Sequence, residues 1–518
     1  MSIQKKRIIP KVFLITLLCL EIISWIYVNL RLNCPYDQDS AKVIYHAVKM
    51  WESKSFVLPN WSYITTGEWD CTAFLAMPIY GITNNIFLAF ALANIINIFL
   101  FVYIIIILFK SAKVQLSYAI IALIILLLPY SVGMLEYSNM LFFSAGQYIY
   151  KVLVPLCIIV LLDYEPNRHI FYNACFLITA LLLLLTTTSS GLYPIVSAVF
   201  PILLIRLLYY IAQRKMPSKR EVIALLMIIG VSILGIFIHY YENINSSADS
   251  QVFVSSTNLI INIQKYFIDS INIFGIFNNE SISVISIKCI TRVLKLMLAF
   301  FVFFLGLISI KDLSKVFKSA FTRESFKTDF SCKSIIKAEL LSLTLINSLL
   351  VILTVPAKRY LLIGTVALII ASVVVFSDIS IQQWCNYLIG ISLIALVILS
   401  FRDFDKEYTI KYSPKTSLKI IEVAQNCNAD NVIFFSSAWA EITRSFDTNL
   451  SCITYIDSET GFFDYDVYYG HKELDTLNQN NIVCLEKDIN TLPIDQFGGY
   501  YYYTSVDNFD IYANIDIP

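Results

Sequence analysis

Long apolar runs separated by short polar segments dominate residues 1–400 of the chain. A helix that crosses a bilayer needs roughly 17–25 mostly apolar residues. The pattern therefore predicts about eleven membrane-spanning helices, near 12–30, 86–109, 116–135, 149–163, 170–188, 192–211, 222–240, 289–310, 339–355, 361–377 and 383–400.

One further apolar stretch, residues 258–274, has a different pattern. Its polar residues, among them Asn262, Lys265 and Asp269, recur at helical spacing on one side, and its apolar residues occupy the other. Crossing the membrane would bury Lys265 and Asp269 at about 2.5–3.5 kcal/mol each. We therefore expect a helix that lies in the membrane interface.

Beyond Phe401 the apolar runs stop and the charged and amide residues increase. The pattern predicts an amphipathic helix over 415–428 and strands near 432–435, 451–456, 481–485, 499–504 and 509–515. We expect two domains: a membrane domain over 1–400 and a small α/β domain over 401–518.

Composition and charge support this organisation. The chain is 57% hydrophobic and 15% charged, whereas soluble domains carry about 25% charged residues. Its formal net charge is zero, so nothing indicates a nucleic-acid partner. Basic residues before the first run, such as Lys5, Lys6 and Arg7, predict a cytoplasmic amino terminus, and an odd number of spans then puts residues 401–518 outside the cytoplasm.

This topology leaves two long outer loops, residues 31–85 and 241–288. The first begins with Asp37 and Asp39 and continues into an amphipathic helix over 40–52, whose polar face carries Lys42 and His46. An aromatic and acidic cluster that includes Glu68 and Asp70 follows. We expect His46 to be a surface residue.

These features resemble the GT-C superfamily of integral-membrane glycosyltransferases, which includes protein O-mannosyltransferases and bacterial aminoarabinose transferases. The segment Leu58-Pro59-Asn60-Trp61-Ser62-Tyr63, running on to Glu68-Trp69-Asp70, is similar to bacterial members, and Pro356-Ala357-Lys358-Arg359-Tyr360-Leu361 is similar to their Pro-x-x-Arg-Tyr element. The resemblance implies transfer of a sugar from a polyprenyl-phosphate donor to an envelope glycan, lipid or protein at the outer face of the membrane.

Such a reaction needs a carboxylate that accepts the proton of the acceptor hydroxyl. Asp37 is the first candidate for this base. Asp39 is the second, although it directly precedes the predicted helix and could simply cap it. Glu68 and Asp70 are candidates for positioning the acceptor or for holding a divalent metal; alternatively, they belong to a solvated turn.

The reaction also needs cations that balance the charge of the leaving lipid phosphate. Arg359 is the candidate, because its planar guanidinium suits phosphate. Lys288, Arg292 and Lys295 share one helix face and could form a second phosphate site; alternatively, they extend to lipid headgroups. A cavity that holds the catalytic carboxylate and the phosphate-binding cations could also be lined by four residues of the next outer segment: Glu136, Tyr137, Gln147 and Tyr148.

A different class of function stays open: a membrane transporter, a flippase or a non-enzymatic envelope-assembly factor. A transporter would place polar groups at mid-bilayer depth between broken helices, whereas the enzyme would gather the carboxylates and cations at the outer surface.

Overall fold

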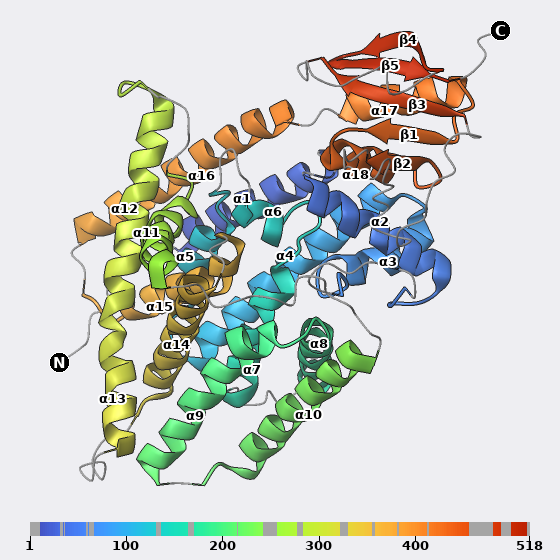
Figure 1. The fold of residues 1–518 in the computed structure, drawn as a ribbon. Helices are drawn as coiled ribbons and strands as arrows, with labels where there is room; N and C mark the ends of the chain where they lie inside the picture. Colours follow the sequence, from blue (N-terminus) through green and yellow to red (C-terminus); the bar gives the residue numbers. More distant parts are fainter. Residues whose placement is uncertain are drawn as a thin grey trace.

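The computed structural model describes most of the chain. The described residues are 11–31, 35, 37–58, 61, 67–130, 136–163, 170–214, 216–241, 256–276, 283–321, 330–354, 358–380, 383–411, 414–454, 480–487 and 499–514. Figure 1 shows a large helical body with a small sheet domain attached at one end.

Eight helical segments of the described chain are long and apolar enough to cross a membrane, by length and composition. They are α1 (Lys11–Arg31), α4 (Ile86–Ser111), η1 with α9 (Ile195–Val199 and Phe200–Gln213), α10 (Lys219–Tyr241), α12 with α13 (Ile287–Ile308 and Ile310–Phe321), α14 (Cys332–Leu353), η3 with α15 (Lys358–Leu361 and Leu362–Phe376) and α16 (Gln383–Lys411). Two other predicted runs coincide with α7 (Ile149–Asp163) and α8 (Ile170–Thr188).

The predicted span over 116–135 is wrong in length, because α5 (Leu116–Leu127) ends early. Leu128 precedes Pro129 and has extended backbone angles (φ −61°, ψ 135°). A residue before proline disfavours the helical conformation because the proline ring clashes with it. The short helix α6 (Glu136–Leu141) then precedes α7.

The core of the bundle is centred on α15, which packs between α14, α12 and α5 (Figure 1). Nearly every side chain of α15 is buried. By contrast, α1, α10 and α12 expose many large apolar side chains, such as Ile23, Phe237 and Phe300. Exposed apolar stripes on long helices are what a lipid environment requires, since lipid tails are as apolar as the side chains.

The amphipathic stretch forms α11 (Ser256–Asn272), which packs on α14. Two of its polar residues, Asn262 and Asp269, are buried against the protein, whereas Lys265 is exposed, as are the apolar Ile260 and Phe267. The amide of Asn262 donates to the carbonyl oxygens of Ile352 and Thr354 at 3.0 and 2.9 Å, so α11 holds the carboxyl-terminal end of α14.

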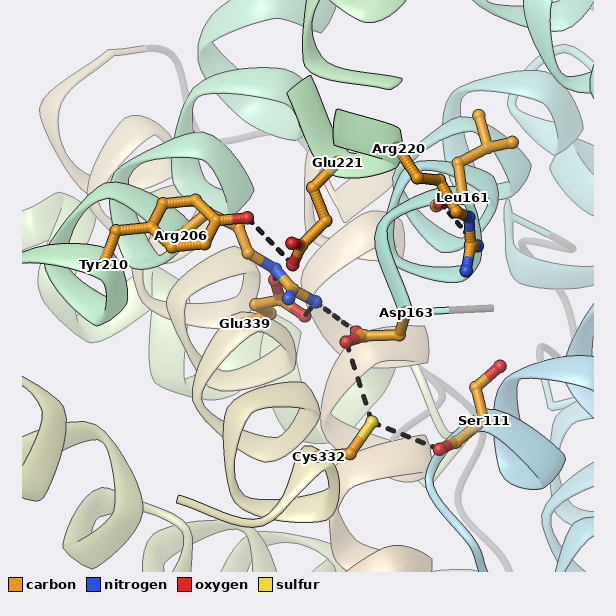
Figure 2. Close-up of polar contacts among 9 residues, drawn as sticks. All are labelled: Ser111, Leu161, Asp163, Arg206, Tyr210, Arg220, Glu221, Cys332 and Glu339. Atoms are coloured by element: carbon orange, nitrogen blue, oxygen red, sulfur yellow. Dashed lines mark hydrogen bonds and ion pairs between the residues drawn. The ribbon is translucent and has the colours of Figure 1, made fainter. Parts of the chain in front are cut away.

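A buried charged cluster joins the helices α7, α9 and α14 (Figure 2). Arg206 of α9 pairs with Glu339 of α14 and with Asp163 at the end of α7, and Glu339 is fully buried. Nearby, the hydroxyl of Tyr210 donates to Glu221 of α10 at 3.1 Å. The cluster connects elements that are far apart in sequence.

The carboxyl-terminal part has the predicted helix and all five predicted strands: α17 (Pro414–Asn426), β1 (Asn431–Phe434), α18 (Ser437–Phe446), β2 (Ser451–Thr454), β3 (Asn481–Glu486), β4 (Tyr501–Val506) and β5 (Phe509–Ala513). The strand order is β2-β1-β3-β5-β4, with β1 parallel to β2 and β3, and with β5 antiparallel to β3 and β4. The α/β class of this part is confirmed.

The sheet domain rests on the membrane domain through α18, which packs against α2 (Gln38–Ser53) (Figure 1). Phe446 contacts Phe87 of α4 with ring centroids 4.8 Å apart. The guanidinium of Arg444 lies 5.7 Å from the ring centroid of Tyr45, a residue of α2. The domain therefore touches the helix that carries the acidic pair of the first loop.

Candidate functional site

The first loop contributes two helices, α2 and α3 (Ala73–Thr83), that pack closely together. Gly81 of α3 makes this possible, since a Cβ at that position would lie 2.1 Å from the ring of Trp51 in α2. The helix α2 is buried along most of its length, because α3 and α18 pack on it.

The structure reverses the expected capping of α2. Asp37 is the N-cap residue: its carboxylate accepts a hydrogen bond from the Ser40 amide at 2.8 Å, and Asn139 donates to it at 3.4 Å. Asp39 lies in the first helical turn instead, so the prediction that Asp39 caps the helix is wrong. Helix α2 begins two residues earlier than expected, and this shift moves the cap position from Asp39 to Asp37.

A cavity of about 160 Å³ lies between α2, the start of α7, the α8–η1 corner and η3. Asp39 lines it, whereas Asp37 is not among its lining residues. Six charged side chains from four parts of the sequence line this cavity: Asp39, Lys42, Glu68, Asp70, Lys151 and Arg359. Tyr148, Tyr193 and Tyr360 add aromatic faces, and Gln147 is also part of the wall.

Arg359 reaches Asp39 across this cavity. Its Nη1 lies 3.2 Å from Oδ2 of Asp39, although 320 residues separate the two in sequence. The guanidinium is 5.5 Å from the ring centroid of Tyr360, which in turn packs on Tyr193. Arg359 follows the end of α14 that Asn262 of α11 holds, so the second long loop helps to place it.

Glu68 and Asp70 lie deeper and are each paired with a lysine. Lys42 Nζ is 2.7 Å from Glu68, and Lys151 Nζ is 2.6 Å from Asp70. Both carboxylates are buried, so the interpretation of a solvated turn is wrong. Burial raises the pKa of the Glu68 carboxyl, against the opposing effect of Lys42.

Metal binding was one of the two functional roles considered for these carboxylates, beside positioning of the acceptor. The described part of the chain contains no group of three His, Cys, Asp or Glu side chains placed to hold a metal ion. Instead, the lysines occupy the positions next to Glu68 and Asp70, and the Nε1–H of Trp61 donates to Glu68 at 3.0 Å.

The three cations of α12 lie away from this cavity, and none of them is among its lining residues. Lys295 is buried inside the bundle, where its ammonium donates to the carbonyl oxygens of Pro129 and Tyr130 at 3.4 and 3.2 Å. Lys288 and Arg292 are partly exposed on α12.

Three residues were not recognised as part of the site from the sequence: Lys42 and Lys151, which line the cavity, and His46, which lies beside it. Lys42 and His46 were expected on a solvated face, but both are buried, and the His46 ring packs on Trp61 with centroids 4.3 Å apart. Lys151 could have been selected from the sequence, since a lysine within an apolar run is a candidate functional residue.

Comparison with known proteins supports the fold through structural similarity. No protein-family model matches the chain, and no curated protein matches it. Among solved structures, the chain is similar to ArnT from Cupriavidus metallidurans bound to undecaprenyl phosphate, with a TM-score of 0.59 and 10% sequence identity, covering 98% of this chain and 99% of that one.

The likeness extends over both the membrane domain and the sheet domain, because it covers nearly the whole of each chain. The protein is therefore a multi-pass membrane protein, as its apolar runs predicted, and its fold is like that of ArnT, in agreement with the resemblance to the GT-C superfamily.

Proposed function

We propose that the protein transfers a sugar from a polyprenyl-phosphate-linked donor to an acceptor of the cell envelope at the outer face of the membrane. The observation that carries the proposal is the contact of Asp39 with Arg359 across one cavity. The GT-C-like fold supports it, since the similar ArnT structure holds undecaprenyl phosphate.

In the proposed reaction Asp39 is the general base. It accepts the proton of the acceptor hydroxyl while the oxygen attacks the anomeric carbon of the donor sugar. The bond between that carbon and the phosphate oxygen breaks, and polyprenyl phosphate leaves with the bonding electrons. Arg359 balances the charge of this phosphate, because its guanidinium keeps its proton and can donate two parallel hydrogen bonds.

The deeper wall of the cavity is suited to hold the sugar. The Lys42–Glu68 and Lys151–Asp70 pairs offer donors and acceptors that burial keeps in place. The rings of Tyr148 and Tyr360 lie 6.3 Å apart beside them and supply apolar faces for the sugar ring. The acceptor in this proposal is an envelope glycan, lipid or protein.

The test uses two substitutions of neighbouring carboxylates. Asp39→Asn removes the proton acceptor, and sugar transfer in membranes should fall by about 10²–10⁴-fold. Asp37→Asn is the matched control, because asparagine caps a helix as well as aspartate does, so its transfer should stay near the parental rate. The measurement follows radiolabelled lipid-linked sugar into envelope fractions at equal amounts of membrane protein.

If Asp37→Asn loses transfer while Asp39→Asn keeps the parental rate, the base is Asp37, which the sequence analysis named as the first candidate. Parental rates in both variants would contradict a base at either position. A strain that lacks the protein should accumulate the lipid-linked donor and lose the corresponding envelope sugar, which would name both substrates.

A further inference from the structure

The charges that line the cavity are already balanced. Three cations, Lys42, Lys151 and Arg359, lie next to three carboxylates, Glu68, Asp70 and Asp39. A phosphodiester donor brings one more negative charge, so it needs a cation whose present carboxylate partner can be displaced.

Two of the three pairs are unsuited to such an exchange because they are buried. The side chains of Lys42 and Glu68 are 6% and 9% exposed, and those of Lys151 and Asp70 are 5% and 1% exposed. Displacing either carboxylate would leave it buried without its cation, which is strongly unfavourable.

The third pair, Arg359 with Asp39, is more exposed than the other two. The side chains of Arg359 and Asp39 are 35% and 51% exposed, and a single contact of 3.2 Å joins them. Water can solvate Asp39 once it is released, and exposed pairs of this kind are weak. The buried Nε–H group of Arg359 also makes no hydrogen bond to the described residues, so the guanidinium has an unsatisfied donor besides the Nη1 group that faces Asp39.

We propose that the Asp39–Arg359 contact is a resting-state latch that the donor's phosphate opens. The phosphate takes the place of the Asp39 carboxylate on Arg359, and Asp39 is set free to accept a proton. Oδ2 of Asp39, which contacts Arg359 in the resting state, becomes available to the acceptor hydroxyl only after the donor has bound. This inference rests on the proposed function and adds an order to it: donor first, acceptor second.

The test measures binding of undecaprenyl phosphate alone to the purified full-length protein, without any transfer step. Asp39→Asn removes the competitor of the phosphate and should tighten binding about 1.4–5-fold, the ratio that corresponds to the strength of an exposed ion pair. Arg359→Gln should weaken binding at least tenfold. Glu52→Gln is the matched control, because Glu52 pairs with Lys49 on the same helix and does not line the cavity.

Each alternative outcome has a distinct meaning. Weaker binding by Asp39→Asn would show that Asp39 helps to hold the phosphate, and unchanged binding would show that no exchange occurs; either result overturns the latch while leaving the transferase proposal standing. Failure of the parental protein to bind undecaprenyl phosphate would overturn the proposed donor class, and the latch with it. Thermal unfolding of each variant separates these results from misfolding.

Discussion

His46 is a histidine that the fold keeps neutral. Its side chain is fully buried in α2 and packs on Trp61. Burial, together with the neighbouring charge of Lys42, lowers the pKa of His46 from 6.5 to about 3. The unfolded chain binds a proton near pH 6.5, whereas the folded protein does not, so protonation favours unfolding.

We therefore expect acid to destabilise the protein through this residue. The contribution of His46 is fully present above pH 6.5 and is lost as the pH falls from 6.5 toward 3, by about 1.4 kcal/mol for each pH unit. His46→Gln should make thermal unfolding less steeply dependent on pH between 7.5 and 5. Equal pH dependence in the two proteins would show that the imidazole is accessible to protons in the folded state.

The roles of Asp37 and Asp39 illustrate what the sequence could not decide. Aspartate can cap a helix at either position, and a helix boundary read from sequence is uncertain by a few residues. A start at Gln38 instead of Ser40 makes Asp37 the cap and turns Asp39 toward Arg359. By contrast, Arg359 could be selected in advance, because its short motif resembles that of a known superfamily.

At the scale of helices and strands, the periodic pattern predicted most elements correctly. The strand β1 and the helix α17 lie within two residues of their predicted bounds, and α2 was also expected. The faces of α2 were harder, because α3 and α18 pack on it and bury residues such as Lys42 that a simple amphipathic helix would expose. A helix pattern shows which side is apolar but not which distant elements will cover the other.

The contact of α2 with α3 makes a testable prediction. A Cβ on Gly81 would lie 2.1 Å from the ring of Trp51, so Gly81→Ala should push the two helices apart. Overpacking of this kind costs about 1–3 kcal/mol, and transfer should fall as well, since α2 carries Asp39. Thermal unfolding and the transfer assay measure the two effects.

Gly230→Ala is the control for this substitution. Gly230 also lies inside an apolar helix, but a Cβ there has no heavy atom within 4 Å. Its stability should therefore stay the same or rise by about 0.5–1 kcal/mol, because alanine favours the helix over glycine. Equal destabilisation by both substitutions would contradict a specific role for the α2–α3 contact.

At the scale of the whole molecule, the polar groups are concentrated at two different levels along the segment formed by η1 and α9. The cavity includes Tyr193 and Pro194, just before η1, whereas Arg206 lies more than ten residues further along, a helical rise of roughly 17 Å. The Arg206 cluster joins α7, α9 and α14, and no sequence pattern indicated it. Pairs that form between distant helices depend on how the helices pack, which a single sequence does not state.

The last prediction concerns which end of the bundle faces outward. Helix α18 packs on α2, so the sheet domain and the cavity share one end of the molecule. The lysines of α13 and the α9–α10 turn belong to the segments that the positive-inside rule assigns to the cytoplasm. We therefore expect Tyr501 to be extracytoplasmic and Met216 to be cytoplasmic.

Substituted cysteines test this in intact cells with a maleimide reagent that cannot cross membranes. Tyr501→Cys and Met216→Cys are suitable because the native side chains are 68% and 93% exposed. The first should be labelled in whole cells and the second only after the membrane is opened, with the parental protein as the control for its native cysteines. The opposite pattern would place the cavity on the cytoplasmic side, and a lipid-linked donor presented at the outer face could then not reach Asp39. Labelling of both in intact cells would mean that the number of crossings between them is even and that the predicted count of about eleven spans is wrong.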